Sequence, residues 1–364
     1  RIKKVFVDNK NFFNLNLKYF EHHESIVDYD FESGYPFFDD LYSIKLENLL
    51  GKSRKSHEPI EQIHKDIAAS LQKVFEDIIL KKINNLHKKY TSDNLCLAGG
   101  CAFNSSLNGK IINQSNFKNI YFSPNVGDAG GAVGSALFFA KKKGEKIPHQ
   151  LNPYLGTSYD NEYVSKNVIN VIKNIKNIKY KYYEDLRSLY DFVSQKIMDG
   201  GVVGWFQDSM EWGPRALGNR SILGDSRNPN MRDIINSKIK RREEFRPFAP
   251  SVLKEKAHIY FKMKGEAPHM SAVYEVIGNM KDLLPAVVHV DNTSRVQTVD
   301  QNINPKFYNL IKSFEAKTGI PLILNTSLNI NEPICENPEN ALEIFTKTSM
   351  DMMVMQNWVM WKDE

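Results

Sequence analysis

The sequence has few cysteines and no long apolar run. Its 364 residues include three cysteines, Cys96, Cys101 and Cys335, and no CxxC pair. An odd number without that spacing argues against a disulfide framework or a zinc knuckle and favours free thiols in a reducing compartment, so we predict a cytoplasmic location. No apolar stretch approaches the ~20 residues of a membrane span, and no signal peptide opens the chain, so we expect no membrane partner.

The sequence also lacks a strong charge. Its 48 Lys and Arg against 43 Asp and Glu give a net charge of +5, which is mild for this length. Lysine-rich runs such as 141–143 are typical of solvated surface, so charge alone does not predict a nucleic-acid partner. The length favours two domains. Because the chain opens with Arg1 and not with Met, we expect a piece of a longer protein.

The first part of the chain predicts alternating strands and helices. Apolar residues at helical spacing predict a long amphipathic helix over about 60–88. A short apolar run at 94–100 stops at paired glycines and predicts a buried strand with a tight turn. A helix over 101–113, a strand at 119–123 and a helix over 132–143 follow. This order predicts an α/β sheet whose ligands gather at the strand ends.

A stretch without periodicity at 141–160 predicts the domain boundary. Beyond it the pattern predicts an α+β domain with helices near 184–198 and over 305–319. The predicted strands of this half are 201–206, 285–290, 294–299 and 320–327. The expected fold class is therefore α/β followed by α+β.

The glycine turn LAGGCAFNSSLNG (97–109) is the first candidate site. Gly99 and Gly100 permit a close backbone approach, and the following helix N-terminus offers free N–H groups to a phosphate or nucleotide. Asn104 lies on the helix face toward that turn. A strand–helix turn capped by Asn104 explains the same residues equally well.

Asp128, in VGDAGGAVGSA, is the second candidate. A capping aspartate at a helix start is the default interpretation, and a metal or nucleotide ligand is the alternative. One carboxylate does not make a metal site. The rings of His22 and His23 diverge because neighbouring side chains point apart, which makes them poor partners.

The densest candidate lies at 211–250. Its cations, set among Gly, Pro and Asn, are Arg215, Arg220, Arg227, Lys240, Arg242 and Arg246. Two like charges ~4 Å apart cost roughly 4 kcal/mol at an effective dielectric of ~20, so a pocket built from several cations needs an anion. Arginine binds phosphate through two parallel hydrogen bonds. We therefore favour a phosphate or nucleotide site over surface charge or a nucleic-acid interface.

Two further segments are expected to close that pocket. HVDNTSRVQTV (289–299) places Arg295 on or beside a strand. ILNTSLNINEPI (323–334) ends a strand in Asn325, Thr326 and Ser327, short polar side chains that suit phosphate oxygens or a carbamoyl carbonyl. A simple turn before Pro333 is the alternative for the second segment.

These segments resemble one family. In order, they are LAGGCAFNSSLNG, GDAGGAVGSAL, GWF…EWGPRALGNRSIL, INSKIKRREEFRPFAPSV, HVDNTSRVQTV and TGIPLILNTSLNINEPI. Together they resemble the nodulation-protein and cephamycin-type O-carbamoyltransferases (the NodU/CmcH family), which include the tobramycin and novobiocin enzymes. The resemblance runs from about residue 40 to the end of the chain.

The resemblance implies two domains and an ATP-dependent reaction. It assigns 1–157 to part of a Kae1-like domain of the actin/Hsp70 ATPase type and 158–364 to a YrdC-like domain. The second would form carbamoyl-adenylate from carbamoyl phosphate and ATP, with Mg²⁺, and the first would transfer the carbamoyl group to an acceptor hydroxyl. By motif, Lys240, Arg246, Arg295, Asn325 and Ser327 are the implied catalytic residues, with Arg215 and Arg220 beside them.

The chain departs from the family pattern in two places. Asp128 matches a family iron ligand, but no HxxxH pair occurs in this sequence to complete the site. A missing N-terminal segment or a homodimer would have to complete the enzyme. The family's Asp-Pro-Arg is also replaced by Asp225-Ser226-Arg227. Two other functions stay open at this point, a threonylcarbamoyl-type tRNA modification protein and a non-catalytic fragment.

Overall fold

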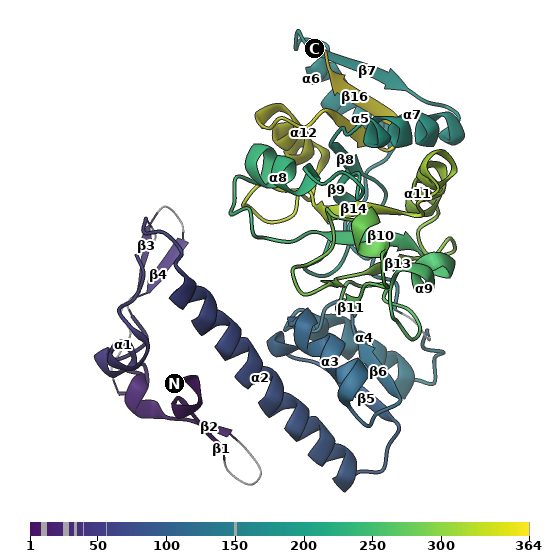
Figure 1. Ribbon diagram of the computed structural model, residues 1–364. Helices are drawn as coiled ribbons and strands as arrows, with labels where there is room; N and C mark the ends of the chain where they lie inside the picture. Colours follow the sequence, from purple (N-terminus) through teal and green to yellow (C-terminus); the bar gives the residue numbers. More distant parts are fainter. Residues whose placement is uncertain are drawn as a thin grey trace. The chain divides into compact units, whose positions relative to one another are not determined.

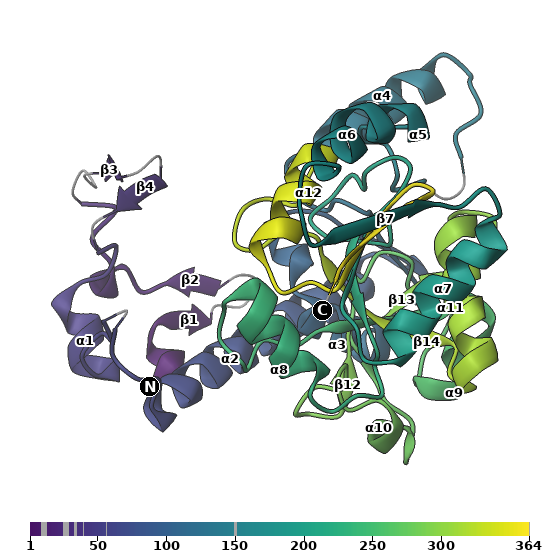
Figure 2. The same ribbon diagram turned by 90° about the horizontal axis from the view of Figure 1, so that it is seen from above.

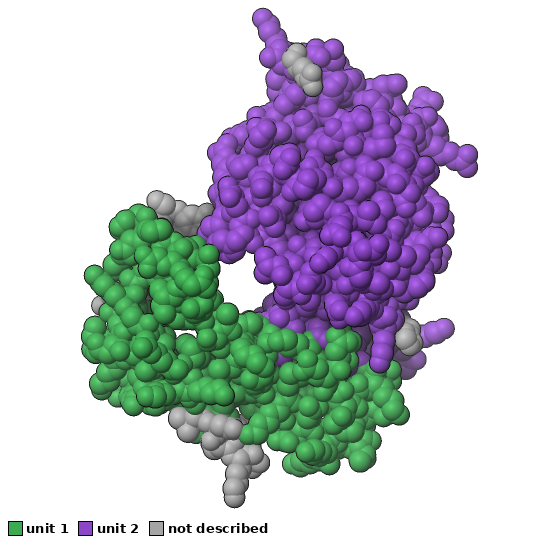
Figure 3. Space-filling view, in the orientation of Figure 1, with its two compact units in different colours: residues 1–95, 110–119 green, residues 96–109, 120–364 purple. Residues whose placement is uncertain are grey.

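The computed structural model describes residues 1–8, 13–24, 29–32, 35–38, 40–55, 57–148 and 151–363. The chain divides into two compact units (Figure 3). Unit 1 comprises residues 1–95 and 110–119, and unit 2 comprises residues 96–109 and 120–364. The predicted assignment of 1–157 and 158–364 to two families of domain stays a prediction.

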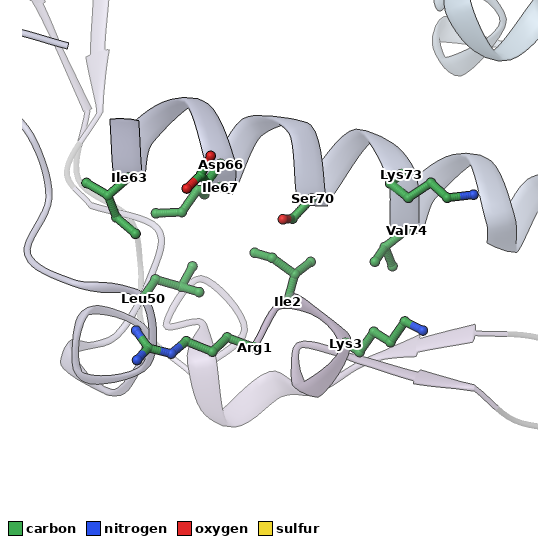
Figure 4. Close-up of a pocket in the computed structure, with 10 residues that line it drawn as sticks. All are labelled: Arg1, Ile2, Lys3, Leu50, Ile63, Asp66, Ile67, Ser70, Lys73 and Val74. Atoms are coloured by element: carbon green, nitrogen blue, oxygen red, sulfur yellow. The ribbon is translucent and has the colours of Figure 1, made fainter. Parts of the chain in front are cut away.

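Unit 1 is organised by one long helix. Helix α2 (Gln62–Lys89) confirms the helix predicted over about 60–88, and a capping box between Glu61 and His64 begins it. Its apolar side chains face η1 (Ile2–Lys4) and α1 (Ile44–Leu50) across an open groove of about 430 Å³ (Figure 4). The other elements of unit 1 are β1 (Phe6–Asp8), β2 (Phe13–Leu15), η2 (Leu17–Tyr19), β3 (Tyr29–Glu32) and β4 (Tyr35–Phe38).

The predicted strand–helix alternation follows, although the first strand is not buried as predicted, since only its Leu95 is buried. It comprises β5 (Asn94–Leu97), η3 (Gly100–Phe103), α3 (Ser105–Gln114), β6 (Asn119–Phe122) and α4 (Gly130–Lys142). The helix predicted over 101–113 is thus interrupted at Asn104, where a short 3₁₀ turn gives way to α3. Cys96, Cys101 and Cys335 are free thiols, as expected, and the first two are exposed.

Unit 2 is built on an eight-stranded mixed sheet, in the order β13-β10-β14-β9-β8-β15-β16-β7 (Figure 1). Its strands are β7 (Ile178–Tyr182), β8 (Val203–Phe206), β9 (Arg220–Gly224), β10 (Ala249–Leu253), β13 (Gln297–Val299), β14 (Leu322–Ser327), β15 (Met352–Met355) and β16 (Trp358–Lys362). The pairs β10–β13 and β8–β15 are parallel, and the others are antiparallel. Strands β8 and β14 confirm two of the four predictions in this half.

Two amphipathic helices cover one face of this sheet. Helices α7 (Leu186–Met198) and α11 (Pro305–Thr318) lie side by side (Figures 1 and 2) and confirm the helices predicted near 184–198 and over 305–319. Asp185 caps α7, while Asn304 and Gly319 bound α11. Their apolar residues form the main core with the strands, including Leu189, Val193, Trp205, Phe307 and Phe314.

The remaining elements of unit 2 are short apart from α12. They are α5 (Asn161–Val164), η4 (Ser165–Ile169), α6 (Asn170–Ile172), α8 (Met231–Ile235), η5 (Asn236–Lys240), η6 (Lys254–Lys256), α9 (Ala257–Tyr260), β11 (Tyr274–Glu275), α10 (Met280–Leu283), β12 (Thr293–Ser294) and α12 (Pro338–Lys347). None of the described helices is both long and apolar enough to cross a bilayer.

Two strand predictions need correction. The apolar run 285–290 forms turns, because its backbone bonds to other loops; the Ala286 N–H donates to the Ser226 carbonyl at 3.2 Å. Only Ala286 and Val287 of this run are buried, and Val290 is fully exposed. The strand predicted over 294–299 is split, since β12 pairs with β11 and β13 pairs with β10. Arg295 lies in the interruption between the two halves.

Candidate functional site

A cavity of about 260 Å³ lies in unit 2 where β10 and β14 run beside each other, with Ala249 opposite Asn325. It is lined by Pro214, Arg215, Ala216, Arg242, Arg246, Pro247, Phe248, Ala249, Met270, Arg295, Asn325, Thr326 and Ser327. Four of these described residues carry positive charge and none carries negative charge. Such a lining attracts an anion and suits phosphate or carboxylate. We call it the arginine cavity.

Arg295 lacks the partners that a buried guanidinium normally has. Its Nε is buried and makes no hydrogen bond, and no described residue accepts from the rest of its guanidinium group. Burial, with the nearby charges of Arg215 and Arg242, lowers the pKa of Arg295 to about 9. The group is therefore still charged at neutral pH, and the unpaired donor is available to a ligand in the cavity.

Arg215 reaches the cavity on the loop 211–219. Glu211 fixes this loop, since its Oε1 accepts the backbone N–H groups of Leu217, Asn219 and Arg220 at 2.7, 2.8 and 3.2 Å. Gly218 has a φ of +107°, and a Cβ there would lie 2.2 Å from the Phe307 ring, so only glycine fits. The GPRALGN sequence is thus explained by packing that presents Arg215.

Arg242 and Arg246 belong to the loop 241–247 at the rim of the cavity. Asn236, which is fully buried, accepts from Arg242 Nε at 2.7 Å through its Oδ1. Its Nδ2 donates to the carbonyls of Glu244 and Arg246 at 3.3 and 3.1 Å. Arg242 also stacks 4.9 Å from the centroid of Phe248. The rim loop is therefore held in place by one asparagine that the sequence pattern did not single out.

Lys240 lies behind the cavity wall. It ends the π-helical turn η5 and is only 1% exposed. Its Nζ donates to Ser327 O (2.5 Å), Ser327 Oγ (3.2 Å), Asn329 O (2.8 Å) and Asn329 Oδ1 (2.7 Å). Burial, and then the charge of Arg242, lowers the Lys240 pKa to about 7. Lys240 thereby fixes the end of β14, where Ser327 meets the cavity.

Asn325 brings an acceptor to a lining that otherwise offers mainly donors. Its Nδ2 donates to Ala216 O, Ser251 Oγ and Gln297 Oε1 at 3.2, 2.9 and 3.1 Å. These contacts fix the orientation of the amide and leave its buried Oδ1 without a partner. The side chain is 1% exposed. A ligand that carries both an anionic group and an N–H donor would match this wall best.

Arg220 does not lie at the arginine cavity. It is fully buried, stacks 3.6 Å from the Phe206 centroid and is not among the described residues that line the cavity. Its NH1 and NH2 donate to the carbonyls of Thr157, Gln207, Asp208 and Asn219. The sequence pattern placed Arg220 beside the phosphate site, but its guanidinium instead ties together the segments around β8.

The glycine turn at Gly99 and Gly100 has free space around it, and Asn104 caps the helix that follows. Gly99 has a φ of +99°, and a Cβ on Gly99 or Gly100 would meet nothing within 4 Å. The Oδ1 of Asn104 accepts from the Leu107 N–H at 3.0 Å, which is the capping contact. Asn108, on the same helix, is buried and its Nδ2 donates to the carbonyls of Ala102 and Ser271, both at 2.7 Å.

The residues around Asp128 do not fit the implied iron ion. Asp128 is exposed, and no side chain caps helix α4. Across the described part of the chain, no three His, Cys, Asp or Glu side chains come together as a metal site would require. The capping interpretation is also not supported. Asp128 is therefore not assigned a role as a metal ligand.

The fold and the cavity together describe an α/β protein with a cavity lined by four arginines. The chain belongs to the carbamoyltransferase family, because residues 10–137 match the family's "Carbamoyltransferase N-terminus" model and residues 194–362 match its "Carbamoyltransferase C-terminus" model. This confirms the resemblance read from the six motifs and the expectation of a transferase family. The arginine cavity lies within the second matched segment.

Curated relatives match over most of this chain. Nodulation protein NolO of Bradyrhizobium diazoefficiens is 37% identical over 83% of this chain and 55% of its own length. An uncharacterized protein of Synechocystis sp. is 38% identical over 96% of this chain and 59% of its own length. The chain thus spans between half and three-fifths of the length of these two relatives.

Solved structures match only loosely. A full-length HypF in its phosphate- and nucleotide-bound form aligns with a TM-score of 0.34, 17% identity, 47% of this chain and 21% of its own. Escherichia coli YciO aligns with a TM-score of 0.35, 14% identity, 47% of this chain and 79% of its own. Alignments this loose do not define shared sites.

Proposed function

We propose that the arginine cavity binds carbamoyl phosphate and the phosphates of ATP, and that the protein is an ATP-dependent O-carbamoyltransferase. The observation that supports this proposal is the lining, which holds four arginines and no acidic residue. Arg246 pairs with Glu243 outside the lining at 2.9 Å, whereas Arg215 and Arg295 have no hydrogen-bond partner among the described residues. Membership of the carbamoyltransferase family supports carbamoyl as the group that is transferred. Carbamoyl phosphate carries both an anion and an NH₂ donor, which suits the free acceptor of Asn325.

The proposed activation has two steps. Water splits the P–O bond of carbamoyl phosphate, giving carbamate and inorganic phosphate. A carbamate oxygen then attacks the α-phosphorus of ATP, and pyrophosphate leaves with the electrons of the broken P–O bond. Fixed guanidinium groups stabilise the charge that builds up on both phosphates, without having to reorganise. Holding both anions together also supplies the proximity that the second step needs.

Each proposed residue has a role that its contacts suggest. Arg215, Arg242, Arg246 and Arg295 neutralise the phosphates. Lys240 and Ser327 fix the end of β14, and Asn325 orients the carbamoyl NH₂. The glycine turn, with Gly99, Gly100 and Asn104, is proposed as a second nucleotide contact during transfer to an acceptor hydroxyl. Residues 158–364 would be the YrdC-like activating domain and residues 1–157 part of the Kae1-like transferring domain.

Pyrophosphate release tests the proposal. The protein, given ATP, Mg²⁺ and carbamoyl phosphate without acceptor, should release pyrophosphate, and omitting carbamoyl phosphate should abolish the release. Replacing Arg215 by Met should lower the rate about 10²–10³-fold, the usual effect of removing one donor to a transition-state anion. Arg232→Met is the matched control, because Arg232 is a partly exposed arginine on α8 that pairs with Asp233 and does not line the cavity. No release by the wild-type protein, or equal rates in the two variants, contradicts the proposal.

A further inference from the structure

The loop 241–247 at the rim of the arginine cavity carries an exposed aromatic residue, Phe245, which is not itself among the lining residues. Phe245 is 69% exposed and lies in the loop 241–247, between the cavity residues Arg242 and Arg246. Single exposed apolar side chains are common on protein surfaces, so exposure alone carries no conclusion. The backbone on both sides of Phe245, however, is fixed by a buried group.

That group is Asn236. Its Nδ2 donates to the carbonyls of Glu244 and Arg246, the residues immediately before and after Phe245. Its Oδ1 accepts from Arg242, so the same side chain positions a cavity arginine and the peptide groups that flank the ring. The Arg246 N–H also donates to the Glu243 carbonyl at 3.2 Å, which closes a turn around Phe245. The backbone that carries Phe245 is therefore fixed between two residues, Arg242 and Arg246, that line the arginine cavity.

The volume of the cavity shows where the rest of a nucleotide must lie. Pockets that enclose a drug-sized ligand are about 300–1,000 Å³. At about 260 Å³ the arginine cavity falls below that range, and its lining offers charges for phosphate groups. When the phosphates of ATP occupy the cavity, the adenosine must project past its rim.

We propose that Phe245 stacks on the purine ring of ATP while the triphosphate lies in the arginine cavity. This rests on the proposed function, since it requires ATP in the cavity. An aromatic face next to a cationic groove is a general way to bind a base. A phenyl ring reads no hydrogen-bonding edge of the base, so this contact accepts adenine and guanine alike. The contact strengthens binding without selecting the base.

Equilibrium binding of two probes tests the contact. Inorganic tripolyphosphate has the phosphates of ATP but no base. By calorimetry, Phe245→Ala should weaken ATP and GTP binding about five- to tenfold, as expected for loss of one base–aromatic stack, and leave tripolyphosphate binding unchanged. Phe245→Trp should bind ATP at least as tightly as the wild type. The matched control is Phe138→Ala on α4, where an equally exposed ring (72%) is removed from a helix that does not line the cavity.

The outcomes separate this proposal from the one beneath it. Unchanged ATP binding by Phe245→Ala, or equal losses for ATP and tripolyphosphate, overturns the stacking contact and leaves the arginine cavity as the phosphate site. Wild-type protein that binds neither probe, or Arg295→Met protein that binds both as tightly as wild type, overturns the proposed function, and the stacking contact with it.

Discussion

The arginine cavity and the glycine turn both lie in unit 2, and they differ in how their polar side chains are hydrogen-bonded. In the cavity, Arg215 and Arg295 have no protein acceptor, and Asn325 keeps a buried acceptor free. At the turn, the Asn104 side chain caps helix α3, and Asn108 donates to two carbonyls, although its buried Oδ1 also has no partner among the described residues. Buried polar groups are normally satisfied, so those left unpaired beside a cavity indicate a ligand.

The same contrast separates two arginines five residues apart. Arg215 faces the cavity without a partner, whereas Arg220 donates through NH1 and NH2 to four different backbone carbonyls and leaves only its buried Nε unpaired. A basic segment in a sequence therefore contains residues of two kinds, and their hydrogen bonds distinguish them. Substitutions of these arginines should therefore have different effects on stability and on ligand binding.

Replacing Arg220 by Met should cost about 3–5 kcal/mol of unfolding free energy. The change leaves several buried carbonyls without a donor and removes a buried positive charge that interacts with Glu211. Arg215→Met should change stability by less than about 1 kcal/mol, because Arg215 makes no hydrogen bond within the described residues. Chemical denaturation of the two variants measures both. Equal losses would mean that hydrogen bonds do not separate structural from ligand-binding arginines.

Replacing Arg295 by Met should stabilise the free protein by about 1 kcal/mol and inactivate it. Burial and two neighbouring arginines disfavour the charge of Arg295, so its removal relieves a cost that a bound anion would otherwise offset. Tripolyphosphate at 100 times its Kd should stabilise the wild type by about 2.7 kcal/mol and the variant far less. Thermal unfolding with and without the anion measures this. A destabilised variant, or one that the anion stabilises fully, would assign Arg295 a structural role.

Residues 305–319 and 320–327 show what the sequence could predict. Regular apolar patterns with caps identify a helix and a buried strand, because burial of one face dominates their stability. Residues 285–290 have an equally apolar pattern but form turns, since their backbone hydrogen bonds involve distant parts of the chain such as Ser226. Local sequence cannot report such contacts.

The candidate site was predictable to a similar degree. Cations placed among glycine and proline predicted a phosphate pocket that includes Arg215 and Arg246, and a separate segment at 289–299 added Arg295. All three line the cavity. The pattern did not predict that Arg220 turns inward or that Asn236 holds the rim, because both depend on carbonyls brought close by folding. In a sequence with many asparagines, Asn236 carries no signal of its own.

Lys240 should make stability depend on pH. Folding lowers its pKa from 10.5 to about 7, so between these values the unfolded chain holds more protons on this group than the folded chain does. The free energy of unfolding therefore rises with pH across this window, by at most about 1.4 kcal/mol per unit. Below pH 7 the cost of burying the charge is fully present. Denaturation from pH 6 to 10 should show this rise in the wild type and lose it in Lys240→Met. Parallel curves for the two proteins would mean that Lys240 folds with an unshifted pKa.

The smallest expected effect is at the glycine turn, where two variants of Asn104 separate a cap from a phosphate ligand. Asn104→Ala removes the acceptor for the Leu107 N–H and should cost about 1 kcal/mol. Asn104→Asp keeps a good cap at a helix N-terminus and should preserve stability. The new carboxylate also repels phosphate, so nucleotide binding at the turn should weaken in this variant even though its fold is intact. If calorimetry gives the same ATP affinity for Asn104→Asp and the wild type, Asn104 only caps the helix. The polar groups of the turn would then serve the fold, and the unpaired groups of the arginine cavity alone would bind the nucleotide.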